Sequence, residues 1–219
     1  QASATGDDTG DNINIANAAT FTTTDTSVLF ETSDVELANA ADLTITTGGG
    51  GSSAGDITFQ GSIHGTSGGT TTNITGLTSG TGTITLNAIN TDIEAVTVSG
   101  PTILKGDITT VDGGAVLITG DVQLDAATIA INTDDTGGNG TITIDGKVDS
   151  ENATNRNLDI VSGTALAKIT GNIGTTTALA TLDINATGAA GVTGGVTLEG
   201  NIGSGSSSAS GQGVVGAGA

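Results

Sequence analysis

Two groups of oxygen-bearing side chains are the residues in this sequence best suited to bind a ligand, and the ligand they suit is calcium. The groups are Asp7, Asp8 and Asp11, and Asp134, Asp135 and Asn139. Ca²⁺ takes carboxylate, amide and backbone carbonyl oxygens as ligands, often in loops. We predict these six residues as candidate calcium ligands. Neither group has the spacing of an EF-hand, and the alternative for each is a solvated acidic turn.

Side chains suited to catalysis are sparse. His64 is the only histidine, cysteine is absent, and the four basic residues are far apart along the chain: Lys105, Lys147, Arg156 and Lys168. Nucleophilic catalysis needs a nucleophile beside its base, and polysaccharide cleavage needs grouped carboxylates or a basic residue. We predict that the chain is not an enzyme and has neither catalytic nor cofactor-binding residues. A polysaccharide-active β-helix enzyme is the last of three alternative functions.

Charge and composition exclude two classes of protein. The 219 residues contain 4 Lys and Arg against 23 Asp and Glu, which gives a net charge of −19, and there is no Trp or Tyr. Nucleic-acid binding needs a basic surface and usually stacking aromatic residues. Because no apolar run reaches the roughly 18–20 residues of a membrane-spanning helix, we predict no membrane insertion. Acidity, few lysines and the lack of cysteine indicate an extracellular, cell-surface protein whose signal peptide has been removed.

A five-residue unit recurs along the chain: an apolar residue, any residue, Gly, any residue and a second apolar residue. It occupies residues 59–63, 104–108, 118–122, 144–148, 169–173 and 198–202. Gly permits a bend where a Cβ would clash or where φ is positive. We predict that each unit joins two short strands and that both of its apolar side chains point inward.

Between these units, apolar and polar residues alternate with a period of two, which indicates half-buried strands. The clearest predicted strands are 83–86, 95–98, 141–144 and 181–184. Their apolar residues are Ile, Val, Leu and Ala, and Gly, Asn, Asp and Ser separate them as turn residues. The chain is therefore predicted to be all-β.

The sequence contains an internal repeat of about 86 residues. Residues 21–37 align without a gap with residues 108–124, and the match continues beyond them with single-residue slips. Two copies, about 19–105 and 106–202, account for most of the chain.

Two architectures fit a repeat of this size. Tandem Ig-like β-sandwiches close their cores with bulky residues, commonly a Trp and a Tyr, and both are absent. A right-handed parallel β-helix, or β-solenoid, stacks small aliphatic residues turn upon turn and needs no large side chain. We predict the β-solenoid, with about 20 residues per turn and roughly ten turns, and keep the tandem sandwiches as the alternative.

The chain resembles the β-strand-repeat regions of giant bacterial surface proteins, the filamentous haemagglutinin-like adhesins. The resemblance lies in residues 55–63, 102–110 and 169–174 followed by 178–182, and it extends over about residues 19–202. It implies a parallel β-helix shaft, export from the cell, and a role in adhesion or in an extracellular matrix.

The ends of a solenoid carry unpaired backbone groups that recruit partners. Neither the polar N-terminal segment, 1–18, nor the Gly/Ser/Ala-rich C-terminal tail, 203–219, has the pattern of a cap. We expect the ends to pair with further copies of the chain, by stacking of turns or by strand addition, with residues 1–18 as a candidate pairing strand. The expected function is structural, as a shaft segment or subunit of a cell-surface fibre that associates end to end. The alternative is an adhesin module that binds glycan or a host surface, although glycan sites generally use exposed aromatic residues.

Overall fold

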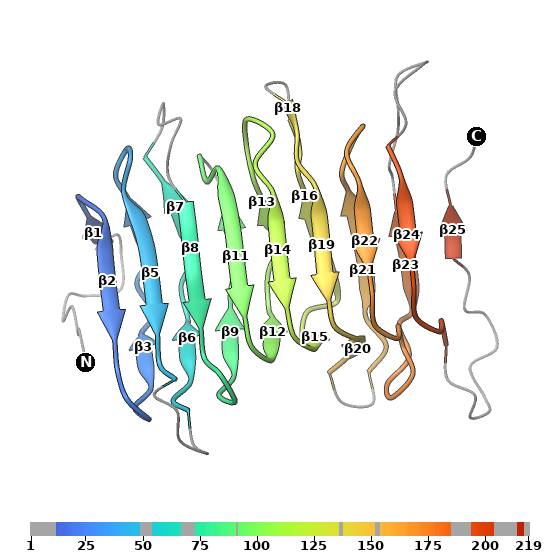
Figure 1. Cartoon of the computed structure of the whole chain (residues 1–219), viewed down its shortest axis with the longest axis horizontal. Coiled ribbons are helices and arrows are strands. Elements are labelled where there is room, and N and C mark those ends of the chain that lie inside the picture. Colours follow the sequence, from blue (N-terminus) through green and yellow to red (C-terminus); the bar gives the residue numbers. More distant parts are fainter. Residues whose placement is uncertain are drawn as a thin grey trace.

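Three sheets of parallel strands run along the chain in its computed structural model and together form a β-solenoid (Figure 1). The structure describes residues 12–48, 54–66, 73–90, 92–135, 138–151, 154–184, 194–203 and 214–216. The chain passes from sheet A to sheet B to sheet C and then returns to sheet A one turn further on. The predicted parallel β-solenoid is confirmed.

Sheet A has nine strands, and sheet B has eight. The strands of sheet A are β1 (Ile13–Ile15), β4 (Val35–Leu37), β7 (Ile63–Gly65), β10 (Ile89–Asn90), β13 (Ile108–Thr109), β16 (Thr128–Asn132), β21 (Asn157–Val161), β23 (Thr181–Ile184) and β25 (Val214–Gly216). Those of sheet B are β2 (Ala19–Thr22), β5 (Asp42–Thr46), β8 (Asn73–Thr78), β11 (Ala95–Ser99), β14 (Val116–Thr119), β19 (Ile142–Asp145), β22 (Ala167–Ile169) and β24 (Val196–Leu198).

Sheet C has six strands, so six turns contribute a strand to every sheet. They are β3 (Val28–Phe30), β6 (Ile57–Phe59), β9 (Ile84–Leu86), β12 (Thr102–Leu104), β15 (Val122–Leu124) and β20 (Val148–Ser150). Two later turns continue this face through single bridges, Val148 to Ile173 and Ile173 to Ile202. A small antiparallel hairpin, β17 (Asp134–Asp135) and β18 (Gly138–Asn139), projects between sheets A and B.

The sheets continue without a break through the middle of the chain. Two tandem sandwiches would instead require a break between the two repeats. β10 and β13 lie on either side of the boundary between the predicted repeats, and they pair in parallel. The alternative of tandem Ig-like sandwiches is therefore wrong. Pairing also extends past residues 19 and 202, because β1 pairs with β4 and β25 pairs with β23.

The core consists of aliphatic side chains stacked from turn to turn. In sheet A the stack is Val35, Ile63, Ile89, Ile108, Ile131, Ile160 and Ile184, each no more than 4% exposed. Phe30 and Phe59 stack face to face in the same way, with ring centroids 4.6 Å apart and an interplanar angle of 2°. Parallel pairing forces this arrangement, because residues in register lie about 4.8 Å apart.

The recurrent five-residue unit forms corners, as predicted, although Ile202 of the sixth unit, 198–202, is 44% exposed. Units 118–122, 144–148 and 169–173 join sheet B to sheet C, and units 59–63 and 104–108 join sheet C to sheet A. In these five units both apolar residues are buried.

At two of these corners a side-chain oxygen next to the glycine binds the backbone of the following turn, which was not predicted from the sequence. Asp121 accepts the backbone N–H of Lys147 one turn on at 3.2 Å, and Asn172 accepts that of Asn201 at 2.9 Å. Each bond satisfies a backbone donor that stands outside the strand ladders. The sequence signal is an Asp or Asn directly after the glycine of the unit.

The 86-residue repeat does not span a whole number of turns. When the two copies are aligned in sequence, β4 of sheet A corresponds to β15 of sheet C, and β5 of sheet B corresponds to β16 of sheet A. Each pair is eleven strands apart in chain order, whereas one turn has three, so matching segments lie on different faces. The ungapped alignment also needs a one-residue slip, because it sets the buried Phe30 against Leu117, which is 38% exposed.

Candidate functional site

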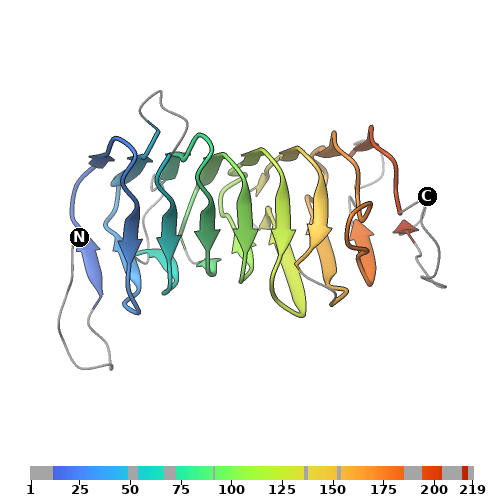
Figure 2. The ribbon, with the colours of Figure 1, turned by 90° about the horizontal axis from the view of Figure 1, so that it is seen from below.

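At the N-terminal end of the described solenoid, part of the apolar core is uncovered. β1, β2 and β3 are the edge strands of the three sheets, and no described strand pairs with their outer edges (Figure 2). Ile13, Ala19, Phe21 and Val28 point inward there but are only half-buried. Phe21 contacts Phe30 edge to face, with ring centroids 5.9 Å apart. A hollow of about 460 Å³ opens beside these residues, between β2 and β3.

The C-terminal end is uncovered in the same manner. Val196 and Ile202 are aligned by pairing with the buried residues Ala167 and Ile173, yet they are 47% and 44% exposed. Leu198, above Ile169, is half-buried. Both ends of the described solenoid therefore present the inward face of a turn to solvent.

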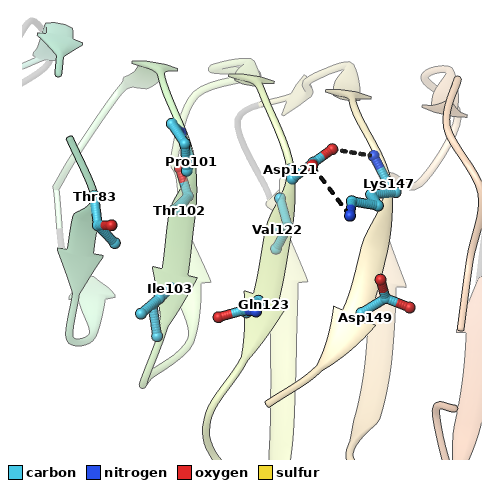
Figure 3. A pocket seen from close by; sticks show the side chains of 9 residues that line it. All are labelled: Thr83, Pro101, Thr102, Ile103, Asp121, Val122, Gln123, Lys147 and Asp149. Atoms are coloured by element: carbon cyan, nitrogen blue, oxygen red, sulfur yellow. Dashed lines mark hydrogen bonds and ion pairs between the residues drawn. The ribbon is translucent and has the colours of Figure 1, made fainter. Parts of the chain in front are cut away.

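A shallow groove crosses the outer face of sheet C on the side where the strands begin (Figure 3). It has a volume of about 270 Å³, and its lining includes Thr83, Pro101, Asp121, Lys147 and Asp149. The Lys147 ammonium lies 3.4 Å from the Asp121 carboxylate. Asp149 is only 5% exposed and accepts the N–H groups of Thr176 at 2.9 Å and Thr177 at 3.3 Å, so its carboxylate holds a neighbouring loop.

A second groove, of about 530 Å³, lies where the same strands end, and it contains a cluster of charges. The Asp125 carboxylate lies 2.9 Å from the Lys105 ammonium and 3.5 Å from the Arg156 guanidinium. Glu151 lines the same groove. The basic residues that are far apart in sequence are thus partly gathered, because Lys105 and Asp125 occupy matching positions on neighbouring turns.

The charges in this cluster favour an ionised carboxylate. The hydrogen bond from Lys105 lowers the pKa of Asp125 below its ordinary value of 3.8, and the positive charges of Lys105 and Arg156 act in the same direction against partial burial. Lys105 is 48% exposed, so solvent screens this pair. Arg156 Nε is buried without a hydrogen-bond partner among the described residues.

Of the two predicted calcium groups, the one at residues 134–139 has its three candidate ligands among the described residues, and the other does not. Asp134 and Asn139 face one another across the β17–β18 hairpin, and Asn139 Oδ1 accepts the N–H of Thr164 at 3.1 Å. Asp135 belongs to the same hairpin. Asp7, Asp8 and Asp11 lie outside the described residues. No cluster of three or more His, Cys, Asp or Glu side chains able to hold a metal ion occurs in the part of the chain that is described.

His64, the single histidine, lies on β7 and is half-buried. Its register partners are Glu36 on β4 and Asn90 on β10. Its Nδ1 atom is 3.5 Å from the carbonyl oxygen of Gly65.

Comparison of the chain with protein-family models, with curated proteins and with solved structures gives no match. Within the described ranges there is no helix of the length and apolar character needed to cross a membrane.

Proposed function

We propose that the chain is a structural extracellular protein, a shaft segment or subunit of a cell-surface fibre, and that it associates end to end. The extracellular setting rests on the acidic composition and the lack of cysteine. The end-to-end association rests on one observation: inward residues that are buried in the middle turns are uncovered at both ends of the described solenoid.

Stacking of two ends would remove this apolar surface from water. Burial of apolar surface contributes about 25 cal/mol per Å². Strand pairing can accompany this packing, because β1, β2 and β3 at one end, and β24 and β25 at the other, have no described partner on their outer edges. A copy of the chain has the matching cross-section, so its uncovered end is the partner that satisfies both demands.

The test is to replace an inward apolar residue at an uncovered end with a charged residue. Phe21→Lys and Val196→Lys would put an ammonium group where a stacked turn must pack, and sedimentation velocity should show the loss of the oligomers formed by the parent chain. The matched controls are Thr22→Lys and Thr197→Lys, which change the outward neighbours on the same strands. Electron microscopy should show threads for the parent and for the controls.

A parent chain that stays monomeric as its concentration is raised would overturn the proposal, and so would controls that dissociate the oligomers as fully as the inward variants. Circular dichroism would establish that each variant keeps its strands. Because the two inward substitutions lie at opposite ends, each tests the contact independently of damage to the other end.

A second candidate is an adhesin module that binds glycan, and the groove at the ends of the sheet C strands favours it. Gln60, Asn87, Lys105, Asp125 and Glu151 line this groove and offer several hydrogen-bonding groups to a sugar. Retention of the monomer on a glycan array, lost in Lys105→Ala, would support this function. Threads without glycan retention would support the shaft.

A further inference from the structure

The outer face of sheet B carries one continuous row of five hydroxyl side chains and part of a second row. One row runs Thr22, Thr46, Thr78, Ser99 and Thr119, in register over five successive turns. The second row contains Thr20 and Thr44, is interrupted at the bulge in β8, and resumes with Thr97 and the aliphatic Leu117. These nine residues, on the strands that Figure 1 shows side by side from β2 to β14, are called the threonine field.

The threonine field contains no ionisable group, although the chain has a net charge of −19. Within the five strands the only carboxylate belongs to Asp42, at the first residue of β5. Beyond β14 the face becomes charged, with Asp145 accepting from Thr170 and Lys168 paired to Glu199 at 2.8 Å. The uncharged surface therefore has a defined limit.

Parallel pairing gives the longer row a regular repeat, and β2, β5 and β11 each add a threonine of the second row beside it. Register partners on neighbouring strands lie about 4.8 Å apart, and alternate residues along a strand lie about 6.6 Å apart. The bulge at Gly76, where φ is +76°, does not break the longer row, because Thr46 is again paired with Thr78. Oxygen atoms on the prism face of hexagonal ice form rows with two perpendicular repeats of similar size.

The threonine field is also rigid. The inward neighbours Ile45, Leu77, Val98 and Ile118 are all 0% exposed. A threonine has a restricted χ1 because it is β-branched. Binding to a regular surface therefore costs little ordering of the protein.

Threonine offers two groups that organise water. Its methyl group restricts the orientation of first-shell water, and its hydroxyl holds water as donor and acceptor. A regular row of such groups favours an ordered water layer, whereas ionic groups would pull water molecules out of a common arrangement.

We propose that the threonine field binds the surface of ice. The ligand is crystalline water, recognised by the regular spacing of methyl and hydroxyl groups on sheet B. This activity is independent of end-to-end association.

The experiment measures thermal hysteresis and the inhibition of ice recrystallisation by the full chain. The parent should hold a seeded crystal below its melting point and give it facets, and Thr78→Lys should lose this effect. The matched control is Thr85→Lys, which changes an outward threonine on β9 of sheet C and should retain it. Circular dichroism and an unfolding curve establish that both variants keep the fold.

A parent chain with no hysteresis and no effect on recrystallisation would overturn the proposal. Equal loss in both folded variants would overturn it as well, because the effect would then not belong to sheet B. If Thr78→Lys changes only the sedimentation of the chain, then the field binds a second copy rather than ice.

Discussion

At the scale of single residues, the glycines of the corners are required by the neighbouring turn. Their pattern predicts bends with a clash or a positive φ, and Gly120 does have a φ of +129°. At Gly146, which has no such φ, a Cβ would overlap the carbonyl oxygen of Gly120 one turn before. The five-residue pattern indicates a bend at each glycine. It does not indicate which residue of the neighbouring turn lies against that glycine.

The substitution Gly146→Ala should destabilise the fold by about 1–3 kcal/mol, because the overlapping atoms belong to the backbone and cannot turn away. Urea unfolding followed by circular dichroism measures this loss. The matched control is Gly48→Ala, whose Cβ would be 3.7 Å from its nearest neighbours, in ordinary contact. Its unfolding free energy should stay unchanged or rise by up to about 1 kcal/mol. Equal destabilisation of the two variants would contradict the close approach at Gly146.

At the scale of elements, the strands were predictable and the loops between them were not. The predicted strand 181–184 is β23, and 95–98 lies within β11. The loops that leave sheet A are closed by buried hydroxyl groups, as where Thr110 donates to the Gly114 carbonyl at 2.7 Å and Thr133 to that of Gly140 at 2.6 Å. In a chain this rich in threonine, the few buried hydroxyls do not stand out from the many exposed ones.

Replacement of Thr133 by Val keeps the shape of the side chain and removes this donor. The hydroxyl is 0% exposed, so its loss should cost about 1–3 kcal/mol and loosen the β17–β18 hairpin that it closes. Unfolding curves measure the first effect, and amide hydrogen exchange of Gly140, whose N–H donates to the Thr133 carbonyl, measures the second. Thr143→Val, at an outward position of β19, should change stability by less than about 0.5 kcal/mol. Unchanged exchange at Gly140 would show that the hydroxyl does not close the loop.

The grooves over sheet C could not be predicted from the sequence. Lys105 and Asp125 are spaced by one turn of the predicted length, but Arg156 reaches Asp125 only because a longer turn returns to the same face. Ile89 pairs with Ile108, whereas Ile131 pairs with Ile160, so the predicted value of about 20 residues per turn holds only for some turns. Loop lengths decide these returns, and nothing in the alternation of residues fixes them.

At the scale of the whole molecule, the class of fold followed from what the core lacks. Without Trp or Tyr, only a stack of small side chains could bury enough surface, and the aliphatic ladders of sheets A to C are such a stack. The uncovered ends follow from the same design, because a stack ends with an open inward face wherever no cap covers it.

Salt should promote end-to-end association of the chain. Two copies with a net charge of −19 repel one another, and the Debye length falls from about 10 Å at 0.1 M salt to about 3 Å at 1 M. Sedimentation velocity at constant protein concentration should show larger species as sodium chloride is raised. Val196→Lys should remain dissociated at every salt concentration, since its end cannot pack. Larger species at low salt than at high salt would contradict this account.

Matching segments of the two repeat copies lie on different sheets, so a rod that lengthens by duplication of this repeat changes the direction in which each surface pattern faces. Each added copy of eleven strands would turn the pattern of surface residues by a third of the circumference. Three successive duplications would restore the original orientation, so a shaft grown in this way would carry its hydroxyl and charged faces as a spiral. A chain grown by units of three strands would instead carry them as straight stripes.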